Sequence, residues 1–318
     1  MNSSKIEKKL KDIEKKISEL KEFSKEKEID LSIEIEKLEV EKKMMLVETY
    51  KNLSSWERVS VARHPKRPYT LDYIEHIVED FEELHGDRLF KEDPAIVGGI
   101  GKIDGKRFVI IGHQKGRDME SNIYRNFGMA NPEGYRKALR LMKLAERFKL
   151  PVLTLIDTAG AYPGIDAEKH GQGEAIARNL MEMAGLSTPI IAVVIGEGGS
   201  GGALALGVAD RVFILENSVY SVISPEGCAA ILYKDASRAP QVANDLKISA
   251  NQLRELGVVD DIIEEPLGGA HRDYEVMAKN LKTKVLEAYV ELKDLSVMEL
   301  KDLRYEKFRK MGEVNQGV

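Results

Sequence analysis

The sequence predicts an α/β fold in which a mostly parallel sheet is covered by helices. Residues 151–156 and 189–195 are almost entirely apolar and begin 38 residues apart, which is typical of strands buried on both faces. A helical segment at about 167–184 lies between them, and strands that alternate with helices form parallel sheets. Both strands end in loops with several glycines. Because ligands bind such sheets at the carboxyl ends of the strands, we expect the functional site in these loops.

Residues 1–50 predict a helical hairpin. These residues carry 12 Lys/Arg and 13 Asp/Glu but no Gly or Pro. Apolar residues recur at a 4-3-4-3 spacing that lines one face of a helix: Ile6, Leu10, Ile13, Ile17 and Leu20. After a polar break, Ser32 is a candidate N-cap for the second helix. We therefore expect an N-terminal helical hairpin at 1–55 and a larger domain at 56–318.

The next part of the chain predicts two helices and a β-hairpin. In order, they are a helix at 72–85, a strand at 95–103, a strand at 106–112, a polar loop at 114–131 and a helix at 132–148. Asp104-Gly105 separates the two strands, and this dipeptide is the strongest short signal for a β-hairpin. Pro132 and Glu133 open the second helix, as expected at a helix start. A short helix and a strand at 211–215 follow the two buried strands.

Composition limits the classes of protein to which the chain can belong. The 318 residues are 43% apolar, which supports a substantial core and excludes wholesale disorder. The formal charge of −5 argues against binding nucleic acid through a general excess of positive charge. The longest strongly apolar stretch, 189–195, is far shorter than the ~20 residues of a membrane span. The N-terminus has no apolar signal core, so we expect a cytoplasmic chain that binds no membrane.

Cys228 is the one cysteine of the sequence. A single cysteine excludes a disulfide framework and any multi-cysteine zinc site within this chain. We expect Cys228 to be a buried packing residue.

The glycine loop at 196–202 fits three motifs. Gly196, Gly198 and Gly201 match the G-x-G-x-x-G dinucleotide fingerprint, with Glu216 as the acid 20 residues on. The helix that follows is too short for that unit, which needs about 30 residues. Gly198 to Gly202 also match the G-x-S-x-G nucleophile elbow around Ser200. Asp260 and His271 follow in the chain order of that fold's Ser-Asp-His triad.

In the third interpretation, the loop needs no reactive side chain. Five glycines among residues 196–202 let the backbone approach a ligand closely. Free N–H groups at the start of a helix form an oxyanion site, which stabilises an enolate or a ureido oxyanion. A turn needed only for tight strand–helix packing explains one or two glycines but not five.

Several long motifs, in order from about residue 55 to 305, resemble the carboxyltransferase alpha subunits of bacterial multi-subunit acetyl-CoA carboxylases. They are RHPKRPYTLDY at 63–73, IGHQKG at 111–116, RNFGM at 125–129, PEGYRKALRLM at 132–142, AERF at 145–148, the glycine loop at 196–207, YSVISPEGC at 220–228 and EPLGGAHR at 265–272. One departure is Ala159, where the family pattern DTPGAYPG has proline. We expect a less rigid loop there but no loss of a reacting group.

The resemblance implies a crotonase-like ββα superhelix and transfer of CO2 from carboxybiotin to acetyl-CoA, giving malonyl-CoA for fatty acid biosynthesis. It implies an alpha2beta2 heterotetramer with a beta subunit that carries a zinc ribbon, and it implies biotin on a separate biotin carboxyl carrier protein, charged by biotin carboxylase. No metal is expected in this chain. The family's oxyanion glycines fall on Gly201 and Gly202, with Gly198 and Gly199 as the adjacent choice.

Other side chains outside the glycine loop are further candidates for the functional site. His113 and Lys115 end a predicted strand and are candidates to face the cofactor; Gly160 and Tyr162 lie in the other strand-end loop and are further candidates. The basic residues at 63–67 are expected to meet coenzyme A phosphates, a partner's acidic surface or solvent. Two alternatives stay open: a subunit that only positions the carrier protein, and an enzyme that carboxylates propionyl-CoA.

Overall fold

The fold is built on one sheet in the computed structural model, which describes residues 3–312. Within these residues the sheet has eight strands. In spatial order they are β1 (Glu79–Glu83), β2 (Ile96–Ile103), β3 (Lys106–His113), β4 (Val152–Thr158), β5 (Ile190–Gly199), β6 (Arg211–Leu215) and β8 (Asp261–Ile263), with β7 (Val219–Ser221) paired to β5. The pairs β1–β2 and β2–β3 are antiparallel and all others are parallel. The predicted mostly parallel sheet is confirmed.

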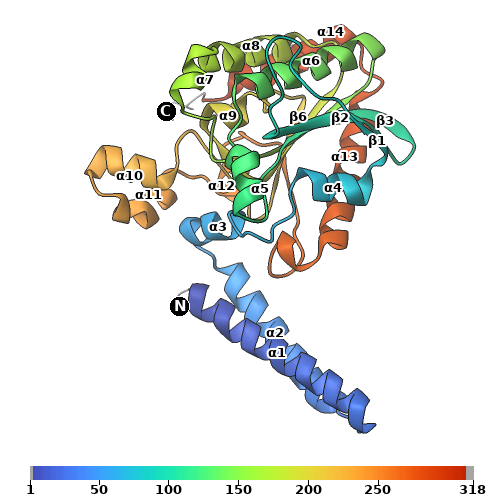
Figure 1. Cartoon of the computed structure of the whole chain (residues 1–318), viewed down its shortest axis with the longest axis vertical. Helices are drawn as coiled ribbons and strands as arrows, with labels where there is room; N and C mark the ends of the chain where they lie inside the picture. Colours follow the sequence, from blue (N-terminus) through green and yellow to red (C-terminus); the bar gives the residue numbers. More distant parts are fainter. Residues whose placement is uncertain (1–2, 313–318) are drawn as a thin grey trace, which may run out of the picture.

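Helices cover both faces of this sheet (Figure 1). On one face lie α6 (Pro132–Phe148), α8 (Gln172–Gly185) and α14 (Val297–Lys310), and on the other lie α4 (Thr70–Ile77) and α13 (Tyr274–Leu292). The buried face of α6 comprises apolar residues at helical spacing, which pack on β2 and β3: Tyr135, Ala138, Leu141, Met142 and Ala145. Two apolar cores result, one on each side of the sheet.

The central strand β5 changes neighbours along its length. Its first part, Ile191 to Val194, pairs with β6, whereas Glu197 to Gly199 pair with β7. On its other side β4 has an irregularity between Ile156 and Thr158. The glycine-rich end of β5 therefore lies at the carboxyl edge of the sheet, between the end of β4 and β7.

The predicted N-terminal hairpin is confirmed, as α1 (Ser3–Lys27) and α2 (Ser32–Lys51). Leu10 and Ile17 are buried and Leu10 packs with Leu46, whereas the side chain of Ile6 lies outside the described residues. The predicted Ser32 cap is wrong. Leu31 holds the N-cap position, and the Ser32 amide instead donates to the Asp30 carboxylate, 3.0 Å away.

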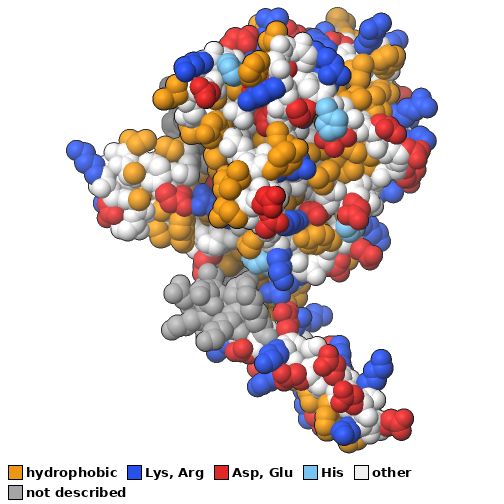
Figure 2. All heavy atoms as spheres, in the orientation of Figure 1, with side chains coloured by type: hydrophobic (Ala, Val, Ile, Leu, Met, Phe, Trp, Pro, Cys, Tyr) orange, Lys and Arg blue, Asp and Glu red, His pale blue; other side chains and the backbone are white. Residues whose placement is uncertain are grey.

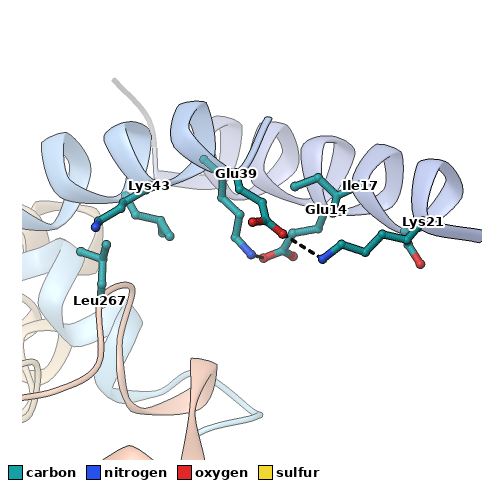
Figure 3. Close-up of a pocket in the computed structure, with 9 residues that line it drawn as sticks. Glu14, Ile17, Lys21, Glu39, Lys43 and Leu267 are labelled. Atoms are coloured by element: carbon teal, nitrogen blue, oxygen red, sulfur yellow. Dashed lines mark hydrogen bonds and ion pairs between the residues drawn. The ribbon is translucent and has the colours of Figure 1, made fainter. Parts of the chain in front are cut away.

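The hairpin projects from the body of the molecule (Figure 1). Near the body, the ion pair of Arg272 with Glu14, at 2.9 Å, fastens α1 to a loop of the larger domain. Figure 3 shows the groove of about 500 Å³ between the two helices and Leu267 of that loop. The division into 1–55 and 56–318 stays a prediction; residues 1–2 and 313–318 lie outside the described residues.

The prediction of one helix at 72–85 is wrong beyond residue 77. Helix α4 ends at Ile77, and residues 79–83 form the edge strand β1. Pairing across the sheet decides this, because β1 lies against two glycines of β2. A Cβ on Gly99 would lie 2.2 Å from the Glu82 carbonyl oxygen, and one on Gly101 would lie 2.3 Å from Val78. Local periodicity carries no information about such a long-range contact.

Smaller elements complete the carboxyl edge. The predicted polar loop at 114–131 holds the short helix α5 (Met119–Tyr124), which Asp118 caps by accepting from the Ser121 amide. The remaining short elements are α3 (Ser55–Ala62), α7 (Ile165–Lys169), α9 (Ser200–Leu204), α10 (Pro225–Tyr233), α11 (Ala239–Asp245), α12 (Ala250–Glu255) and three 3-10 turns, η1 (Asn126–Gly128), η2 (Ala236–Arg238) and η3 (Ala270–Arg272). Across residues 3–312, none of the helices has the length and apolarity needed to cross a membrane.

Candidate active site

The chain turns sharply from β5 into α9 at Ser200. Strand β5 ends at Gly199, and Ser200 has a positive φ of 52°, a left-handed conformation that costs a residue with a side chain roughly 1–2 kcal/mol. Residues 198–202 are called the glycine turn below. The Ser200 side chain is exposed at its apex.

The expectation that packing explains only one or two of the five glycines at 196–202 is wrong: an added Cβ would lie within 3.0 Å of a neighbouring atom at every one of them except Gly201. A Cβ on Gly199 would lie 2.1 Å from the Ala159 carbonyl oxygen, and one on Gly202 would lie 2.6 Å from the Ala161 amide nitrogen. The glycine turn therefore rests directly on the backbone of the other strand-end loop. At Gly201 the nearest atom to such a Cβ is Ile176 Cδ1, at 3.4 Å, an ordinary contact. Packing alone does not explain a glycine at this position.

The two predicted glycine pairs differ in what their amides do. Gly198 and Gly199 lie in the strand ladder, where both pair with β7 and Gly198 also pairs with β4. Gly201 and Gly202 are the second and third residues of α9, so their N–H groups have no acceptor four residues back within the helix. The geometry favours Gly201 and Gly202 as the donors.

Two cavities meet at the glycine turn and share Ser200, Gly201 and Val222. The smaller, about 410 Å³, is also lined by Gly160 and Tyr162, so three of the predicted site residues are brought together. The larger, about 600 Å³, is mainly apolar; its further lining includes Leu204, Tyr220, Leu246, Leu253 and Phe308.

The loop with Gly160 keeps its shape without the proline expected at position 159. The Thr158 hydroxyl donates to the Gly160 carbonyl oxygen at 2.7 Å and accepts from the Gly160 amide at 3.1 Å. The Tyr162 amide donates to the Ala130 carbonyl oxygen at 3.0 Å. These hydrogen bonds supply the local restraint that a proline would otherwise supply.

His113 and Lys115 lie beneath the glycine turn, and neither lines the two cavities. The Lys115 ammonium pairs with Asp157 Oδ1 at 2.5 Å, and the same oxygen accepts from the Glu197 amide at 2.9 Å. His113 is 0% exposed, and its ring lies next to the backbone of Leu155 and Gly202. The expectation that they face the cofactor is not met in these cavities: His113 is buried at the end of β3, and the ion pair with Asp157 holds Lys115.

Burial of His113 makes a pH dependence of stability expected. Burial lowers the pKa of the imidazole from 6.5 to about 4, so the folded chain keeps it neutral. An unfolded chain takes up a proton there near pH 6.5. The free energy of unfolding that this group contributes is therefore complete above about pH 6.5 and is lost as the pH falls towards about 4, by on the order of 2 kcal/mol.

Urea unfolding of the wild type and of His113→Gln, each at about pH 7 and about pH 5, measures this contribution. We expect the wild type to lose more stability than the variant between the two conditions. The loss of stability between the two pH values is compared for the two proteins, so any cost of the substitution that does not depend on pH cancels. Equal losses would show that His113 does not titrate with folding.

The structure does not assemble the hydrolase triad. His271 stacks on His64 with ring centroids 3.9 Å apart, and the Asp260 carboxylate binds Lys307 and the Val212 amide. Neither is hydrogen-bonded to Ser200 or to the other in the described part of the chain. The dinucleotide alternative fails as well, because α9 has five residues.

The sequence did not indicate the buried charged groups that support the glycine loop from below, above all Arg67. Arg67 was expected at the surface, but it is 0% exposed and donates to the Glu265 carboxylate, to Ser218 and to the Ile195 carbonyl oxygen just before the glycine loop. Its place in a basic, proline-rich segment gave no signal of burial. Cys228 is buried against Ala229, as expected. Residues 3–312 contain no group of three or more His, Cys, Asp or Glu side chains that could hold a metal.

Solved structures resemble the chain in fold. Transcarboxylase 12S matches with a TM-score of 0.57 and 20% identity, over 70% of this chain and 41% of that one. A Pseudomonas malonate decarboxylase MdcD-MdcE hetero-dimer matches with a TM-score of 0.55 and 18% identity, over 68% of this chain and 89% of that one. These neighbours share the crotonase fold, so the predicted crotonase-like fold is confirmed.

Sequence comparisons are more specific. A family model described as acetyl co-enzyme A carboxylase carboxyltransferase-like matches residues 3–312. Relatives named acetyl-coenzyme A carboxylase carboxyl transferase subunit alpha include one from Fusobacterium nucleatum subsp. nucleatum, 66% identical over 96% of this chain and 98% of the relative. Another, from Geobacter metallireducens, is 58% identical over 96% of both chains. The chain therefore belongs to the acetyl-CoA carboxylase carboxyltransferase alpha family, and it is a carboxyltransferase subunit.

Proposed function

We propose that this chain, together with a beta subunit, transfers CO2 from carboxybiotin on the biotin carboxyl carrier protein to acetyl-CoA, giving malonyl-CoA in the first step of fatty acid biosynthesis. One observation carries the proposal beyond family membership. Gly201, the second residue of α9, lies at the junction of two cavities, where a Cβ on it would meet only Ile176; Gly202 is buried directly after it and lines neither cavity.

The residues present fit the ureido group of biotin. A ureido oxygen that gains negative charge needs hydrogen-bond donors held in place beforehand, and backbone amides at a strand–helix turn meet that need. When bound, carboxybiotin supplies the CO2 and the base for the acetyl methyl group. The chain's own residues orient and donate: Gly201 and Gly202 offer N–H groups, while Gly160 and Tyr162 form the opposite wall. Ser200 forms no hydrogen bond to Asp260 or His271 in the described part of the chain, and this mechanism requires no nucleophilic side chain.

The partners are proposed on the same basis. The relatives are named as alpha subunits, and a beta subunit with the zinc ribbon would complete an alpha2beta2 heterotetramer that also holds acetyl-CoA. Biotin carboxylase would recharge the carrier protein, and the assembly would work in the cytoplasm. Biotin is the cofactor proposed, carried on the separate protein and not on this chain.

Co-expression with the beta subunit tests the proposal. The purified complex is assayed for carboxylation of acetyl-CoA and of propionyl-CoA with the carboxylated carrier protein as donor. Malonyl-CoA formation by the complex, and not by either subunit alone, is the expected result. A complex that forms but transfers no CO2 to either thioester would refute the function, and a preference for propionyl-CoA would change the substrate.

A further inference from the structure

Helices α10 and α11, residues 225–245, form a lobe that protrudes from the body beside the glycine turn (Figure 1). The residues just before the lobe, Val222, Ile223 and Ser224, line the smaller cavity, and the Ser224 hydroxyl accepts from the Gly227 amide as the cap of α10. The placement of the lobe therefore determines one wall of the candidate site.

An apolar cluster joins the lobe to the body. It comprises residues from the end of the lobe, from α3 and from β7 and the chain after the lobe: Ala243, Leu246, Val59, Ala62, Trp56, Val219 and Ile248. The outer surface of α10 exposes Ile231 and Leu232, and Figure 2 shows hydrophobic side chains on the protruding lobe. Apolar packing is non-directional, so directional contacts are needed to fix the orientation of the lobe.

Arg63 bridges this lobe to the strand that carries the glycine turn. It caps the C-terminus of α3, and its guanidinium donates from Nε and Nη2 to the two carboxylate oxygens of Glu197, at 2.9 and 2.6 Å. Its Nη1 donates to the Glu226 carboxylate at 2.5 Å. Glu197 directly precedes the glycine turn in β5, and Glu226 lies in the first turn of α10. One planar, permanently charged group thus joins both walls.

The Glu197 end of this bridge is itself held rigidly. Its amide donates to Asp157 Oδ1, which is paired with Lys115. Its carboxylate is mostly buried, with 9% of the side chain exposed, and a partly desolvated ion pair with two parallel hydrogen bonds is strong and directional. Arg63 therefore couples the position of the lobe to the position of the backbone just before Gly198.

We propose that Arg63 is a positioning residue that holds the α10–α11 lobe against the glycine turn and so keeps the cavity in the shape that admits the carrier-bound group. The inference rests on the proposed function for its effect on catalysis. The ion-pair bridge from Glu226 through Arg63 to Glu197, called the tether below, does not depend on the reaction.

Hydrogen exchange of the full-length chain tests the tether. In Arg63→Gln, we expect the amides of residues 225–245 to exchange about tenfold faster, since a hydrogen bond between charged groups is lost. Glu226→Gln should give the same regional change. Arg178→Gln is the matched control, because Arg178 forms an exposed pair with Glu182 on α8, away from the lobe. Unchanged exchange in the lobe of Arg63→Gln, or an increase spread over the whole chain, overturns the proposal.

Kinetics of the complex with the beta subunit test the effect on catalysis. We expect Arg63→Gln to raise the KM for the carboxylated carrier protein about tenfold, with the KM for acetyl-CoA unchanged. Arg63→Lys keeps the charge but reaches only one carboxylate, so it should restore the KM in part. Equal effects on both substrates would overturn the positioning role. A wild-type complex without transfer activity would refute the proposed function, and the exchange result would still decide the tether.

Discussion

Gly201→Val abolishes carboxyl transfer while the subunit stays folded and still binds its partner. The structure has room for a Cβ at Gly201, 3.4 Å from Ile176, so the substitution places its methyl groups in the cavities that meet there. We expect the rate of malonyl-CoA formation to fall by at least about 100-fold, the scale on which one oxyanion donor matters. The assay is carboxylation by the purified complex, with thermal unfolding of the subunit measured in parallel.

Three further variants distinguish a specific effect at Gly201 from a general effect of the valine side chain, from loss of a serine nucleophile and from misfolding. Gly185→Val makes the same change at a helix end where nothing lies within 4 Å, and it should leave transfer unchanged. Ser200→Ala should keep much of the activity, because the proposed mechanism uses backbone amides and no serine nucleophile. Gly202→Ala should destabilise the fold, since its Cβ would meet backbone at 2.6 Å. Full activity in Gly201→Val would remove the glycine turn from the site, and full loss in folded, assembled Ser200→Ala would revive the hydrolase alternative.

Arg67→Met lowers the free energy of unfolding by about 3–5 kcal/mol, the usual cost of removing one partner of a buried ion pair. Both side chains of the Arg67–Glu265 pair are 0% exposed. Burial alone would raise the pKa of the Glu265 carboxyl, but the ion pair with Arg67 and further hydrogen bonds lower it below its ordinary value. Without the guanidinium, a buried carboxylate loses its counter-charge, and the Ile195 carbonyl oxygen before the glycine loop loses its donor.

Urea unfolding of the purified subunit measures this loss. The matched control is Arg254→Met, whose exposed pair with Asp261 should contribute no more than about 1 kcal/mol. The double variant Arg67→Met with Glu265→Gln should be more stable than Arg67→Met alone, because it also removes the unpaired charge. If Arg67→Met and Arg254→Met unfold at the same urea concentration, the buried pair contributes no special stability.

Much of the fold could be predicted because its signals are local. The apolar runs that became β4 and β5 and the Asp104-Gly105 turn between β2 and β3 depend on near neighbours, and the structure confirms them. The Arg67 segment and the α4–β1 boundary could not be read this way. In both, a partner far along the chain decides the outcome: Glu265 lies 198 residues from Arg67, and β1 exists because β2 offers glycines to its backbone.

The same distinction between local signals and contacts of distant segments holds for the candidate site. The sequence by itself determined that a glycine-rich turn follows a buried strand, that it suits an oxyanion, and to which family its motifs belong. Only the tertiary structure distinguished the two glycine pairs, because strand pairing engages Gly198 and Gly199 while Gly201 and Gly202 begin a helix. It also buried His113, held Lys115 in an ion pair and joined Arg63 to Glu197 and Glu226. Residue type and spacing specify backbone conformation, whereas burial and ion pairing depend on which distant segments pack together.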